Sequence, residues 1–66
     1  MAMVESILDA PDQIVPEKGV VRAYQSKREI GGKIFLVRVM VDDTADPAVV
    51  VTAYRTRKIE KYWETP

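Results

Sequence analysis

The segment 33–42 constrains the fold most, because it is apolar on both sides of an extended backbone. Its first alternating row contains Phe35, Val37, Val39 and Val41. Its second row contains Ile34, Leu36 and Met40, interrupted by Arg38. A strand with two apolar faces belongs inside a sheet that is covered on both sides. The chain must therefore place a layer on each face of this strand.

Two further segments have strand character and are joined to 33–42 by turns. Segment 20–28 precedes Gly31-Gly32, a strong turn signal, and segment 48–56 is rich in β-branched residues. The polar run 42–47 forms the second turn. These short connections predict a three-stranded antiparallel meander with 33–42 in the middle.

The N-terminal segment 3–10 has one apolar side, which predicts a short amphipathic helix that ends before Pro11. We expect Met3, Ile7 and Leu8 of this helix to pack on the row that begins with Phe35. The stretch 11–19 is predicted to be a loop, in which Ile14 and Val15 point inward.

The C-terminal segment 57–63 places Ile59, Tyr62 and Trp63 at helical spacing. It is predicted to form a short helix or to extend the third strand. The predicted fold is therefore α+β, a single small domain over residues 1–66 with an N-terminal helix on a three-stranded sheet.

The composition predicts a second copy of the chain as a partner. A domain of 66 residues is marginally stable alone, and one short helix covers only one of the two apolar sheet faces. A twofold dimer is therefore expected, with contacts through Ile34, Leu36, Tyr62 and Trp63. The absence of Cys and His excludes disulfides and any Ser-His-Asp or Cys-His site within one chain.

Metal ions, cofactors and membranes are not expected. Asp42, Asp43 and Asp46 lack the spacing of a calcium loop and fit an ordinary turn. The apolar runs are too short to span a bilayer, and the first residues do not resemble a signal peptide. These features predict a cytoplasmic protein with no membrane partner.

The segment 55–61 is locally basic although the chain has ten Lys+Arg and ten Asp+Glu. Its cations are Arg55, Arg57, Lys58 and Lys61. Together with Arg38 and the nearby aromatic residues, they could bind phosphates and stack bases of a polyanion such as RNA. The alternative is a solvated strand edge, at which Lys and Arg prevent unwanted pairing. Arg38 has a corresponding alternative, in which its stem is buried and its charge reaches solvent.

Three stretches resemble small phage- and plasmid-associated bacterial proteins of the barnase–EndoU–colicin–RelE nuclease group, which includes RelE-like and BrnT-like toxins. They are Ile7-Leu8-Asp9-Ala10-Pro11-Asp12, then Val-Arg-Val-Met-Val within 37–41, and Val51-Thr52-Ala53-Tyr54-Arg55-Thr56-Arg57-Lys58-Ile59. The resemblance covers nearly the whole chain through short, apolar motifs.

This resemblance implies metal-independent RNA cleavage, with Thr52, Tyr54, Arg55 and Lys58 as the catalytic candidates. Arg38, Arg57 and Lys61 would bind the nucleic acid, and an antitoxin-like protein would be a further partner. Members often have a His-bearing helical segment before the Leu-x-x-Pro-Asp stretch. Either this His is dispensable, or the chain is a truncated copy. Alternation already places Thr52 and Tyr54 on one face of their strand and Arg55 on the other. The competing interpretation is a non-enzymatic protein-interaction module that forms a homo-oligomer, and the zero net charge favours it.

Overall fold

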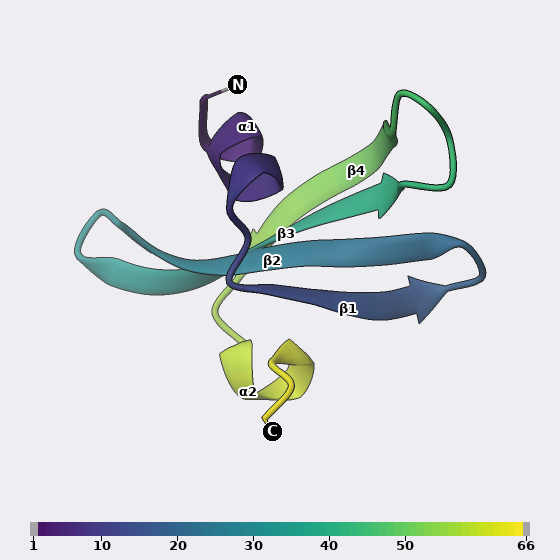
Figure 1. The fold of residues 1–66 in the computed structure, drawn as a ribbon. Helices are drawn as coiled ribbons and strands as arrows, with labels where there is room; N and C mark the ends of the chain where they lie inside the picture. Colours follow the sequence, from purple (N-terminus) through teal and green to yellow (C-terminus); the bar gives the residue numbers. More distant parts are fainter. Residues whose placement is uncertain (1, 66) are drawn as a thin grey trace.

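A computed structural model describes residues 2–65 of the chain. Its elements are α1 (Ala2–Asp9), β1 (Gln13–Lys18), β2 (Val21–Ile30), β3 (Lys33–Asp42), β4 (Val49–Thr56) and α2 (Ile59–Tyr62). The strands form one antiparallel sheet in the order β1-β2-β3-β4, with a helix on each side of it (Figure 1). The predicted α+β class and N-terminal helix are confirmed, and the tail forms a helix.

The prediction of three strands is wrong, because part of the predicted loop 11–19 forms the edge strand β1. Val15 pairs with Ala23 of β2, and the register shifts between Pro16 and Lys18. Proline has no N–H for a ladder, so it is tolerated at a sheet edge. Pairing with β2, rather than an alternating pattern of its own, therefore makes this segment a strand.

The helix α1 covers the first face of the sheet. Ile7 is fully buried against Val37, Val39 and Val41, which confirms most of the predicted contact row. Phe35 lies outside this cluster, and the Arg55 guanidinium lies 4.8 Å from its ring centre. A helix of eight residues is about 12 Å long and cannot cover a ten-residue strand of about 33 Å.

The opposite face is covered partly by the chain's C-terminal end. Val15, Ala23 and Met40 form a small apolar cluster there. Leu36 is fully buried within the single chain, so it offers no surface to a second copy, whereas Ile34 is exposed. The second face is therefore apolar around Met40 and polar around Arg38.

Candidate functional site

The side chain of Arg38 is the centre of a polar cluster on the α2 side of the sheet. Its guanidinium donates hydrogen bonds to Gln25 Oε1 at 2.8 Å, to the Tyr54 hydroxyl at 2.7 Å and to Glu17 Oε2 at 2.7 Å. Only 2% of Arg38 is exposed. These partners come from β1, β2 and β4, so one side chain on β3 connects all four strands.

The C-terminal end closes over this cluster. Gln25 Nε2 donates to Gln13 Oε1 and to the Tyr62 carbonyl oxygen. Gln13 Nε2 donates to the Glu64 carbonyl, and Glu64 N–H donates back to Gln13 Oε1 at 3.2 Å. We call Arg38, Gln25, Gln13, Glu17, Tyr54 and Tyr62 the Arg38 network.

The electrostatics of the Arg38 network favour a charged, fully engaged guanidinium. Burial lowers the pKa of Arg38, but the hydrogen bonds to Tyr54 and Glu17 outweigh it and the pKa is raised overall. The Tyr62 ring lies 4.2 Å from the guanidinium carbon and adds a cation–π contact. Among residues 2–65, every buried side-chain nitrogen and oxygen has a partner. The network therefore holds the sheet together, and it leaves almost no guanidinium surface for an incoming phosphate.

Tyr62 differs electrostatically from an ordinary tyrosine. Its hydrogen bond with Lys61, followed by that with Tyr54, lowers the pKa of its hydroxyl, although desolvation acts in the opposite direction. The rings of Tyr54 and Tyr62 meet edge to face at 6.5 Å. The pKa of the Tyr62 hydroxyl is thus lowered by its place beside Lys61 and the Arg38 network.

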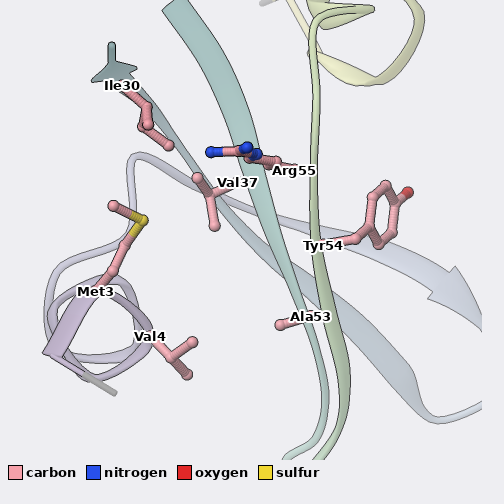
Figure 2. A pocket seen from close by; sticks show the side chains of 7 residues that line it. All are labelled: Met3, Val4, Ile30, Val37, Ala53, Tyr54 and Arg55. Carbon is pink, nitrogen blue, oxygen red and sulfur yellow. The ribbon is translucent and has the colours of Figure 1, made fainter.

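The four catalytic candidates do not converge on one point. Thr52 pairs with Met40 and Tyr54 with Arg38, which places both on the α2 face. Arg55 pairs with Val37 on the α1 face, and Figure 2 shows Tyr54 and Arg55 pointing to opposite sides of β4. Lys58 lies beyond the strand, where its backbone N–H donates to Thr56 Oγ1 at 3.1 Å. The face assignment made from sequence is confirmed, and it separates Arg55 from Thr52 and Tyr54.

The nucleic-acid-binding candidates are also separated. Arg57 and Lys61 are exposed together with Lys58 around α2, whereas Arg38 is buried. Two cations lie against aromatic rings at this end: Lys27 Nζ is 4.1 Å from the Trp63 ring centre and Lys61 Nζ is 5.2 Å from that of Tyr62. We call Lys27, Arg57, Lys58 and Lys61 the basic end.

An acidic turn lies at the other end of β4. Asp43 accepts hydrogen bonds from Arg22 Nε and from the Tyr24 hydroxyl, the latter at 2.8 Å. Asp42 accepts from the backbone N–H and hydroxyl of Thr44, which lowers the pKa of the Asp42 carboxyl. We call 42–46 the acidic turn, and these contacts hold the carboxylates of Asp42 and Asp43 in place.

The outer strand β4 exposes apolar side chains along most of its length. Every residue of β4 except Thr56 is exposed. Of the eight large hydrophobic residues exposed within 2–65, four lie on this strand: Val49, Val50, Val51 and Tyr54. A register shift opposite Met40 and Val41 leaves Val51 without a partner on β3. The outer edge of β4 is therefore apolar, and no strand of residues 2–65 pairs with it.

A groove of about 370 Å³ runs beside β4 on the α1 face (Figure 2). Met3 and Val4 of α1 form one wall, and Ala53 and Arg55 lie on the β4 side. The groove lies beside β4 because α1 packs mainly over β2 and β3. The β4 edge and this groove form one continuous surface, which we call the β4 surface.

Sequence reasoning identified Arg38 as unusual but missed its partners. Glu17 lies in the segment predicted to be a loop, and Gln25 lies in a predicted strand with no sign of its contact to β3. The interruption of an apolar row by Arg38 was the available signal, since a buried Arg requires polar partners.

Comparison of the chain with protein-family models, curated proteins and solved structures gives no match. Within residues 2–65, no three acidic, His or Cys side chains are arranged to hold a metal ion. None of the helices in that range is long and apolar enough to cross a membrane. The Arg38 network, the two charged ends and the β4 surface are therefore the features from which a function can be inferred.

Proposed function

We propose that this chain is a non-enzymatic protein-interaction module that binds through the β4 surface by adding a strand to its sheet. One observation carries the proposal: an eight-residue edge strand is exposed over seven residues and bears three consecutive valines. An exposed apolar edge presents backbone N–H and C=O groups together with hydrophobic side chains. Strand addition uses both kinds of group, because main-chain bonds give affinity and side chains give specificity.

The distribution of the candidate catalytic side chains supports this proposal over RNA cleavage. Tyr54 and Arg55 project from opposite faces of β4, so they cannot act on one phosphate without a rearrangement of the strand. Arg38 already gives hydrogen bonds to three side chains of its own chain. A binding role requires neither catalytic side chains that converge on one point nor an Arg38 that is free to contact a ligand.

A strand peptide tests this proposal directly. We would titrate a synthetic peptide of residues 47–57 into the isotopically labelled chain and follow the amide resonances by NMR. The expected result is saturable shifts in β4 and in the groove residues of α1, and none with a scrambled peptide. Val51→Lys should abolish the shifts, because a charge at the edge opposes pairing.

Val20→Lys is a matched control, since Val20 is 57% exposed and Val51 is 58% exposed, and Val20 lies in the β1–β2 turn. It should leave peptide binding unchanged. Absence of any β4 shift at millimolar peptide would remove the proposed function.

A second candidate function is RNA binding by the basic end, in line with the resemblance to RelE-like and BrnT-like toxins. The favouring observation is the placement of Lys27 and Lys61 against Trp63 and Tyr62, beside exposed Arg57 and Lys58. Cations next to aromatic rings are the usual elements of single-strand binding. An antitoxin-like protein would in that case be an expected partner.

Titration with labelled single-stranded RNA at low and moderate salt, with EDTA present, tests this candidate. Binding should weaken steeply with salt, and Lys61→Ala should reduce it while Lys18→Ala, at the opposite end of the sheet, should not. Lack of binding by the wild type at low salt would rule out RNA binding by the basic end. Loss of intact RNA during the titration would instead support RNA cleavage by the chain.

A further inference from the structure

We infer that the partner of the β4 surface is a second copy of this chain, paired antiparallel through β4 about a twofold axis. This inference rests on the proposed function and adds the identity of the occupant. In the dimer the two sheets join into one, and each basic end lies against the acidic turn of the other copy.

The charges at the two ends of β4 support this arrangement. The acidic turn immediately precedes the strand, and Arg57 and Lys58 immediately follow it. Asp46 and Lys58 lie equally far from Thr52 along the chain. Antiparallel pairing centred on Thr52 therefore brings the acidic turn of each copy, with Asp46, to the end of β4 at which Lys58 of the other copy lies, whereas parallel pairing would put like charges together.

The strand β4 is apolar on both sides of the proposed axis. Val50 and Val51 precede Thr52, Ala53 and Tyr54 follow it, and all four are exposed. Because the register shifts at Val51, Val50 lies on the α1 face and Tyr54 on the α2 face. The dimer therefore gains apolar contact along the edge rather than pairs of side chains on one face.

The geometry closes at two copies. A twofold contact uses the same surface on both chains, and the other sheet edge, β1, carries Pro16 and a register shift. A typical stable interface buries about 800 Å² per partner, about one sixth of the 4607 Å² exposed by this chain. Pairing of one short strand falls below that area, so we expect a dissociation constant in the micromolar range.

Sedimentation equilibrium of the full chain, from about 1 µM to 1 mM, tests the inference together with a charge exchange. We expect a monomer–dimer equilibrium for the wild type. Asp46→Lys and Lys58→Glu should each weaken dimerisation about fivefold to thirtyfold, because each dimer contains two such pairs. The double variant should return the dissociation constant to near the wild-type value.

Lys18→Glu provides the control, since Lys18 is an exposed lysine on β1, and it should have no effect. All of the exchanged residues are exposed, and circular dichroism would confirm that the variants fold. A monomer at all concentrations that still binds the β4 peptide overturns the second copy but keeps the β4 surface as a binding site. A monomer that binds no peptide overturns both proposals. A dimer that ignores the charge exchange and Val51→Lys overturns this interface.

Discussion

The two edges of this sheet are protected very differently. At β1 the strand has six residues, contains Pro16 and shifts register before Lys18. Gln13 at its start is also tied to the C-terminal tail by hydrogen bonds with Glu64. Prolines, charges, irregular pairing and covering segments are the means by which proteins keep sheet edges from associating.

At β4 most of these means are missing. The strand has eight residues and no proline, and Arg55 is its one charged residue. Its register shift at Val51 is the single irregularity, and no segment of 2–65 pairs with its outer side. This contrast between a protected edge and an apolar one supports the proposal that β4 binds a partner.

The largest expected effect comes from removing the side chain that connects both edges. Arg38→Ala removes the partner of Glu17 on β1 and Tyr54 on β4, and leaves Gln25 buried without its donor. We expect the free energy of unfolding to fall by about 2–4 kcal/mol. Thermal unfolding followed by circular dichroism measures this. Arg57→Ala, at an exposed arginine, is the control and should change stability by less than about 0.5 kcal/mol.

A charge placed on the β4 edge should have the next largest effect, which is on the dissociation constant of the dimer. Val51→Lys should raise the dissociation constant of the dimer by about tenfold or more, since like charges then face each other near the axis. Sedimentation equilibrium gives the constant. Equal weakening by Val20→Lys would mean that the two edges do not differ in the way described.

Removing the protection of β1 should make the edges alike. The double variant Pro16→Val with Lys18→Val restores a backbone N–H and removes a charge from that edge. With two adhesive edges, each copy can pair on both sides, and species larger than a dimer should form as concentration rises. Light scattering would detect them, and a variant that stays dimeric would show that the covering tail alone suffices.

The smallest effect concerns two tyrosines on opposite faces of the sheet. The hydrogen bond from Tyr24 to Asp43 raises the pKa of the Tyr24 hydroxyl, while the Lys61 hydrogen bond lowers that of Tyr62. In an ultraviolet titration Tyr62 should therefore ionise at lower pH than Tyr24. Tyr62→Phe should remove the lower of these two steps, and Tyr24→Phe should remove the higher.

These two pKa shifts change the stability of the folded state with pH in opposite directions. Because the folded pKa of Tyr24 is raised, its contribution to stability is fully present below about pH 10 and is lost as the pH rises through the folded value. Tyr62 acts in the opposite sense, since its lowered pKa favours the folded state at higher pH. A titration in which Tyr24 ionises before Tyr62 would contradict both assignments.

The regular parts of the fold could be predicted from local pattern. The alternation in 33–42, the apolar side of 3–10 and the β-branched run at 48–56 gave β3, α1 and β4 close to their observed bounds. The strand β1 could not be predicted, because Pro16 interrupts it and its stability comes from pairing with β2. Local sequence carries no information about such a partner.

The site was predictable to a lesser degree. Alternation correctly separated Arg55 from Tyr54, and the odd position of Arg38 marked it for attention. Its contacts to Glu17 and Gln25 depend on the register between strands, which a single sequence does not reveal. The predicted meander made β4 an outer strand, and its exposure could be predicted from that position. Its apolar composition alone would have suggested a buried strand.

Amide hydrogen exchange at low and high protein concentration tests the contrast between the edges most directly. Measured by NMR at about 10 µM and 1 mM, the β4 amides that do not bond to β3 should exchange more slowly at the higher concentration. The outer amides of β1 should exchange at the same rate in both samples. Unchanged rates along β4, or protection that grows at β1 instead, would contradict the assignment of β4 as the edge that binds a second copy.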